Sequence, residues 1–212
     1  DQEFQYIVEN KLYNLDGQIA FSQNHQPVNF PSGDFATDKS GVMEVKLAWK
    51  ELDPKRDIPS RFYTQTLLLP DLDKNGEPIL DGNGKFKNCQ KQLMGLVGMH
   101  ISTKTKSSPQ WIWATFEHVD NLNANDLEKV DGKSLYALFH DFSPAVQTLP
   151  VNVPPIPRNP NTGKPDPNGV LKTQVSRPIP IPKAKQALNQ SMQLLLATEE
   201  SPLQYYQLID TP

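Results

Sequence analysis

The chain has 212 residues, of which 37% are hydrophobic and 20 are prolines, so one modest core with a large share of loop is expected. Its net charge is -3, and acidic and basic residues are mixed along the sequence. The sequence has neither a basic cluster, which would favour nucleic-acid binding, nor an apolar run of membrane-spanning length. The single cysteine, Cys89, excludes an internal disulfide, a cysteine-based metal cluster and a covalently attached haem, and an inert, buried or half-buried thiol is expected there.

The first thirty residues contain apolar side chains at helical spacing. Phe4, Ile7, Val8 and Leu12 fall on one side of a helix. We therefore predict a short amphipathic helix that ends near Asp16-Gly17, because aspartate and glycine are common where helices stop. A polar loop with two prolines and a glycine follows this helix.

Four stretches then have the composition and length of β-strands, namely 43–49, 62–69, 93–101 and 111–119. In the first stretch apolar and polar side chains alternate strictly, which predicts one buried face. That face comprises Met43, Val45, Leu47 and Trp49.

The third stretch is apolar on both faces and should therefore lie at the centre of a sheet. Gly95 and Gly98 within it indicate a close approach of a neighbouring element or a bulge. Turn-rich links join consecutive stretches, and such links predict antiparallel neighbours. The expected fold is mainly β: an antiparallel sheet or sandwich with one or two peripheral helices and a long, ordered Pro-rich loop.

Residues 150–182 contain ten of the prolines and favour extended, polyproline-like backbone. Disorder is the alternative, but aliphatic residues could pin this segment to the sheet: Val151, Val153, Ile156, Val170, Val175, Ile179 and Ile181. A helix is expected around 183–198. We therefore expect one domain, made of a β-rich core with the N-terminal helix at 1–149, the Pro-rich segment packed on it at 150–182, and a helix with a tail at 183–212.

The sharpest candidate site combines His100 with Glu117, His118 and Asp120. Two imidazoles and a carboxylate are suitable ligands for zinc or another transition metal. A structural role, in which the histidines are hydrogen-bonded and packed on aromatic rings, is the favoured alternative. In an antiparallel hairpin His100 would lie beside residues close to 111–113, so the two imidazoles need not meet.

Aromatic residues form a second candidate site. Trp111 and Trp113 share one face of a strand and would form a platform for a sugar or a partner protein if exposed, whereas buried they are core, which we favour. Tyr205 and Tyr206 near the C-terminus are further candidates for a ligand-binding groove.

The oxygen ligands of a calcium loop are suggested by Asp71, Asp73 and Asn75, which precede Gly76 at the appropriate spacing. Position twelve of that loop is Gly82 instead of the closing glutamate. Because Asn-Gly is also an ordinary hairpin signal, a solvated turn is favoured over calcium.

Two blocks of the sequence, Leu96-Val-Gly-Met-His-Ile-Ser-Thr-Lys-Thr and Pro109-Gln-Trp-Ile-Trp-Ala-Thr-Phe-Glu-His-Val-Asp-Asn, resemble a block in large exported bacterial proteins of unknown function, often loosely labelled "cytochrome c family". The resemblance extends to residues 4–14, 43–50, 61–64 and 205–209. It implies export and a longer protein with a further N-terminal region. The cysteine pair that the family carries before Pro-Val-Asn is missing from 143–152, so its role is absent here.

The first functional hypothesis is an exported, periplasmic or extracellular module that binds a ligand or partner without catalysis. The alternatives are a metal-dependent enzyme or redox protein that uses the His/Glu/Asp cluster, and a structural completion of a larger multidomain protein. The expected partners are the N-terminal remainder of the same protein, another protein or a glycan, with neither nucleic acid nor a membrane span.

Overall fold

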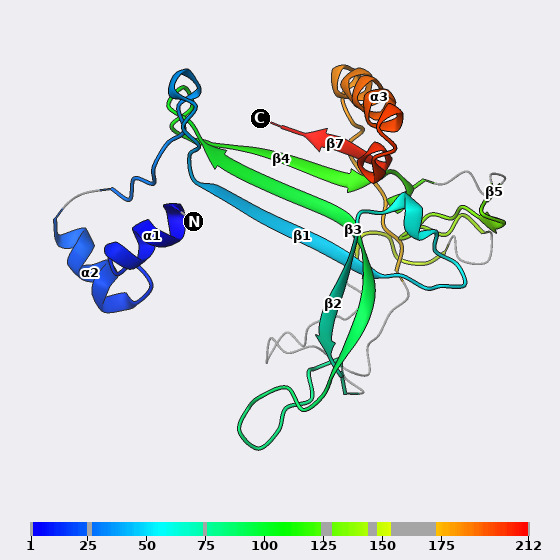
Figure 1. Ribbon diagram of the computed structural model, residues 1–212, viewed down its shortest axis with the longest axis horizontal. Coiled ribbons are helices and arrows are strands. Elements are labelled where there is room, and N and C mark those ends of the chain that lie inside the picture. Colours follow the sequence, from blue (N-terminus) through cyan, green and yellow to red (C-terminus); the bar gives the residue numbers. More distant parts are fainter. Residues whose placement is uncertain are drawn as a thin grey trace. The chain divides into compact units, whose positions relative to one another are not determined.

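A computed structural model describes residues 2–24, 27–73, 76–123, 129–143, 148–153 and 173–211. The chain is mainly β, with antiparallel sheets and peripheral helices, as predicted (Figure 1). It divides into two compact units. Unit 1 comprises Asp1–Leu47, Met99–Phe116 and Leu208–Pro212, and unit 2 comprises Ala48–Gly98 and Glu117–Gln207.

The main sheet of the described residues has five strands: β1 (Met43–Glu51), β2 (Thr64–Pro70), β3 (Cys89–Lys104), β4 (Trp111–His118) and β7 (Tyr206–Asp210). Its order is β1-β3-β4-β7, and β2 pairs antiparallel with the first part of β3. The four predicted strands and the central position of the third are therefore confirmed. The strand β7 was not predicted, because its five residues are too few to show a clear period.

The helices are α1 (Gln2–Glu9), α2 (Leu15–Gln23) and α3 (Lys183–Thr198), and a short hairpin joins β5 (Lys129–Val130) to β6 (Lys133–Ser134). The bounds predicted for α3 are confirmed. None of the helices in the described ranges is long and apolar enough to cross a membrane.

The prediction of one N-terminal helix ending near Asp16-Gly17 is wrong. Helix α1 stops at Glu9, and Lys11 adopts a left-handed conformation with φ of 55°. Asn14 then caps α2, and its side-chain oxygen accepts a hydrogen bond from the Gly17 N–H at 2.7 Å. Asp16-Gly17 is therefore the first turn of a second helix.

The core of unit 2 is small. Leu52, Phe62 and Val97 are buried together, and Leu138 packs against them. Gly95 lies against this cluster, where an added Cβ would approach a methyl of Leu52 to 2.8 Å and the ring of Phe62 to 2.9 Å. The predicted close approach at Gly95 is thus confirmed, since only glycine fits there.

The sheet in unit 1 has a polar face, and the N-terminal segment packs on part of it. Lys104 is buried and donates a hydrogen bond from Nζ to Oδ1 of Asn29 at 2.6 Å. The ring of Phe30 lies edge-on to Trp111, with 6.0 Å between their centroids, and its centroid is 5.1 Å from that of Tyr6. Side-chain contacts of His100 with Thr115 and of Ser102 with Glu44 place these residues on the same face.

The opposite face of this sheet is apolar, and we name it the apolar face. By alternation it consists of Met43, Val45, Leu47, Met99, Ile101, Ile112, Ala114 and Phe116. None of these side chains is buried, and Met43, Val45 and Leu47 are 58%, 52% and 42% exposed. The prediction that these three residues form a buried face is therefore wrong, because the covering segment packs on the polar side of the strands.

Most of the Pro-rich segment, 154–172, lies outside the described residues, as do Ile156 and Val170. At its two ends, the Asn152 N–H donates to the Gln174 carbonyl and the Gln174 N–H donates to the Pro150 carbonyl, both at 2.8 Å. Val151, Val153, Val175 and Ile179 are exposed. Hydrogen bonds of the backbone and of the polar side chains Asn152 and Gln174, and not these four exposed aliphatic side chains, thus hold the two ends, whereas Ile181 is half-buried.

Candidate functional site

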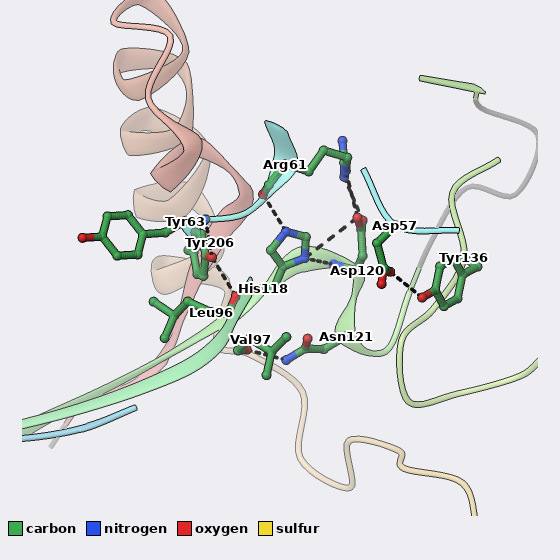
Figure 2. Close-up of polar contacts among 10 residues, drawn as sticks. All are labelled: Asp57, Arg61, Tyr63, Leu96, Val97, His118, Asp120, Asn121, Tyr136 and Tyr206. Atoms are coloured by element: carbon green, nitrogen blue, oxygen red, sulfur yellow. Dashed lines mark hydrogen bonds and ion pairs between the residues drawn. The ribbon is translucent and has the colours of Figure 1, made fainter. Parts of the chain in front are cut away.

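Several buried polar residues of unit 2 lie around His118, the last residue of β4, which is fully buried (Figure 2). Its Nε2–H donates to the Arg61 carbonyl at 2.9 Å, and its Nδ1 accepts from the Asp120 N–H at 3.1 Å. This pair of backbone contacts selects the tautomer that carries its proton on Nε2. Burial lowers the pKa of His118, so the ring is neutral at pH 7.

Aromatic rings enclose the imidazole. Phe62 stacks on His118 with 4.3 Å between the ring centroids, and Tyr206 meets it edge-on at 5.3 Å. The Tyr206 hydroxyl donates to the Leu96 carbonyl at 2.7 Å and accepts from the Tyr63 N–H at 3.0 Å. Burial raises the pKa of Tyr206 to about 12. These contacts satisfy backbone groups that would otherwise be unpaired inside unit 2.

A buried ion pair lies beside this ring cluster. The Arg61 guanidinium donates to both carboxylate oxygens of Asp120, from Nε at 2.9 Å and from Nη2 at 2.8 Å. The guanidinium also lies over the ring of Tyr205, 4.3 Å from its centroid. Bidentate pairing of this kind is the arrangement in which buried charges are best tolerated.

Asn121 extends the network from the turn that follows β4. Its side-chain Nδ2 donates to the Val97 carbonyl at 2.8 Å, while its buried Oδ1 has no partner among the described residues. The amide therefore joins this turn to the middle of β3.

A small, open pocket adjoins the ion pair. Its walls are formed by Arg56, Asp57, Ile58, Arg61, Phe62, Asp120, Ser134, Leu135, Tyr136 and Leu138. The Arg56 guanidinium lies over the ring of Tyr136, 4.1 Å from its centroid. Cations therefore contact aromatic rings at two places in unit 2.

Asp57 is a third buried charged residue in the pocket walls, besides Arg61 and Asp120. It accepts hydrogen bonds from the Tyr136 hydroxyl at 2.5 Å and the Asp53 N–H at 2.6 Å, and it pairs with Lys50. Burial by itself would raise the pKa of Asp57, but the hydrogen bonds from Lys50, Tyr136 and Asp53 outweigh burial and lower it. The carboxylate is therefore charged and its oxygens are occupied by protein groups.

The four residues of the predicted metal site belong to different units. His100 is in unit 1, where its Nδ1 lies 2.8 Å from Oγ1 of Thr115. This contact is two residues beyond Trp113, the end of the range 111–113 that was expected beside His100. Glu117, His118 and Asp120 are in unit 2, and Glu117 contacts Arg177 and Gln207. In the described ranges, no three His, Cys, Asp or Glu side chains are grouped to hold a metal. A metal at these residues stays a prediction.

The aromatic candidates are also divided between the units. Trp111 is half-buried against Phe30 and Trp113 is 48% exposed, both in unit 1. In unit 2, Tyr205 is half-buried under the Arg61 guanidinium and Tyr206 is buried with its hydroxyl engaged. Trp113 is thus the most exposed of the four side chains.

The candidate calcium residues lie in the hairpin between β2 and β3. Oδ1 of Asp71 accepts from Gln90 at 2.8 Å, and Oδ1 of Asp73 accepts from the Glu77 N–H at 3.0 Å. Asn75 lies outside the described residues. Cys89 is exposed at the start of β3, so the expectation of a buried thiol is wrong.

Sequence reasoning did not identify the partners that surround His118 and Asp57. Arg61 and Asp120 are separated by 59 residues, and Asp57 and Tyr136 by 79, so no local spacing connects them. The comparisons with known protein families, curated proteins and solved structures find no match. Function must therefore be inferred from the side chains themselves.

Proposed function

We propose that this chain is a non-catalytic binding module that docks on a partner protein through the apolar face of unit 1. The observation that supports this proposal is the inversion of the sheet in unit 1. The N-terminal segment packs on the polar face of β1, β3 and β4, at Lys104 and Trp111, while three of the eight side chains on the apolar face are exposed and five are half-buried.

Antiparallel sheets normally bury the apolar face and present the polar face to water. Three exposed and five half-buried apolar side chains on three adjacent strands depart from this arrangement, and a contiguous apolar patch of that kind is typical of a protein interface. The patch contains one aromatic ring, Phe116, among aliphatic side chains, a composition that favours a protein partner over a glycan. Glycan binding, the alternative, would instead use Trp113 on the opposite face.

The polar cluster of unit 2 supports a scaffold role. Both ring nitrogens of His118 contact backbone groups, and both oxygens of Asp120 contact Arg61. Residues held in this way position the segment around Arg61 against the end of β4 and are poorly placed to exchange protons with a substrate. The residues of this cluster therefore favour a binding module over an enzyme.

The test is site-specific photo-crosslinking in the cells that make the protein. A photoreactive amino acid is placed at Val45 on the apolar face, and a matched control is placed at Val28, which has the same side chain and similar exposure, 50% against 52%, elsewhere in unit 1. We expect a discrete adduct with a second protein at Val45 and not at Val28. Equal adducts at both positions would overturn the proposal.

Structural completion of a longer polypeptide is the second candidate for the same face. In that case the crosslink from Val45 would join the face to another segment of the same polypeptide, and digestion of the product would identify it. On the resemblance alone, we also propose that the chain acts after export, in the periplasm or outside the cell.

A further inference from the structure

Helix α3 packs within unit 2 through its polar ridge. Asn189 is buried, and the Gln193 side-chain amide donates to the Tyr206 carbonyl at 2.9 Å. Lys185 and Leu196 on the same side are half-buried. Amphipathic helices of globular proteins usually turn the apolar stripe inward, so the orientation of α3 is the reverse of the common one.

The helix exposes a mostly apolar ridge, which we name the apolar ridge, formed by Ala184, Ala187, Leu188, Ser191, Met192, Leu194 and Leu195. All seven residues are exposed, and Leu188, Leu194 and Leu195 are 50%, 71% and 53% exposed. The ridge covers three helical turns, about 17 Å at the usual rise per residue. A surface of this length matches the face that one helix presents to another.

The charges of α3 oppose its own dipole. Lys183 opens the helix, which has no acidic residue in its first turn, and Glu199 and Glu200 follow its last turn, which has no basic residue. Positive charge at an N-terminus and negative charge at a C-terminus are unfavourable for an isolated helix. The same charges are complementary to a second α3 that runs in the opposite direction.

We propose that two copies of this chain pair through α3 in an antiparallel, two-fold symmetric contact. The register that sets Lys183 of one copy opposite Glu199 of the other also sets Leu195 opposite Ala187 and places Ser191 on the two-fold axis. Leu195 then faces Ala187, Leu188 faces Leu194, and the ends carry opposite charges. The proposal concerns unit 2 alone and does not depend on the partner proposed for the apolar face.

The first test is disulfide trapping with the full chain. Cys89→Ser removes the native thiol, and Ser191→Cys then places one cysteine per copy at the predicted axis. We expect mild oxidation to yield a covalent dimer at low micromolar concentration. The matched control is Gln190→Cys, one residue along on the exposed polar side, which should stay monomeric. Equal trapping of both variants would contradict the register.

The second test is sedimentation of variants without added cysteines. Leu195→Glu should weaken the dimer at least about tenfold, because it introduces a charge into the apolar contact, while circular dichroism should show an unchanged helix. Lys183→Glu should weaken it about fivefold by facing Glu199, and Lys183→Glu with Glu199→Lys should restore it. A wild-type chain that is monomeric up to about 100 μM, or a dimer insensitive to Leu195→Glu, would overturn the proposal.

Discussion

Arg61 donates two parallel hydrogen bonds to Asp120, a residue 59 positions further along the chain, and both side chains are buried. The pair joins the short helical turn Pro59–Arg61 to the turn Val119–Asn121 that follows β4. If one charge is removed, the other is left buried without water to stabilise it. The effects of the two substitutions on the free energy of unfolding should therefore be coupled.

Arg61→Ala should lower the free energy of unfolding by about 3–5 kcal/mol, because it leaves the Asp120 carboxylate buried and unpaired. Asp120→Ala should have a comparable cost, and the double variant should cost clearly less than the two single effects added. Urea denaturation measures all three. Lys106→Ala, which breaks the ion pair of the exposed Lys106 with Asp34, is the control and should change little. Strict additivity would contradict the coupling.

His118 should make stability depend on pH below about 6.5, the ordinary pKa of histidine. Burial lowers its pKa in the folded state, so the unfolded chain binds a proton that the folded chain does not. The free energy of unfolding should therefore fall as the pH falls, by at most about 1.4 kcal/mol per pH unit from this group. In His118→Gln, whose amide can still donate to the Arg61 carbonyl, this contribution should vanish. Parallel pH profiles of both proteins would refute the assignment.

Tyr206→Phe should lower the free energy of unfolding by about 1–3 kcal/mol. The variant keeps the ring but leaves the Leu96 carbonyl and the Tyr63 N–H without their shared partner. Thermal and urea unfolding would measure the loss. Tyr13→Phe is the control, because Tyr13 is exposed, and it should have little effect. Similar small effects in both variants would mean that the buried hydroxyl is not needed.

Val45→Lys should reduce the binding of the dye anilinonaphthalene sulfonate to the folded protein, because it places a charge in the apolar face. Since Val45 is already exposed, the free energy of unfolding should change by no more than about 0.5 kcal/mol. Val28→Lys makes the same chemical change outside this face and should leave dye binding unaltered. A large loss of stability in Val45→Lys would show that another part of the chain covers the face.

Gly95→Ala should destabilise the core of unit 2 by about 1–3 kcal/mol, since the added methyl meets Leu52 and Phe62 at less than van der Waals distance. Gly82→Ala is the matched control, because nothing lies within 4 Å of a Cβ built there. Urea unfolding compares the two, and an effect of equal size at both positions would argue against overpacking.

The elements of this protein follow largely from local pattern. Strict alternation predicted β1, the doubly apolar stretch predicted β3 as a central strand, and helical spacing predicted the bounds of α3. The N-terminal helix was misplaced because Asp16-Gly17 is equally compatible with a helix end and with the first turn of a helix, and the Asn14 cap decides between them.

The candidate site was only partly predictable. A structural role for His118, packed on aromatic rings, was the favoured interpretation, but its partners Arg61, Phe62 and Tyr206 are remote in sequence. No local sequence pattern predicted the contact between the pocket residues Asp57 and Tyr136, because they are 79 residues apart in the chain.

The sequence by itself determined the strands β1 to β4, the helix α3 and the apolar sides of β1 and α3, because period and propensity act over a few neighbouring residues. Only the tertiary structure decided which side is covered. In unit 1 the segment around Phe30 packs on the polar face of the sheet, and in unit 2 the polar ridge of α3 contacts the carbonyl of Tyr206. The physical reason is that hydrogen-bond partners distant in sequence selected these contacts, and the apolar sides of β1 and α3 were left exposed.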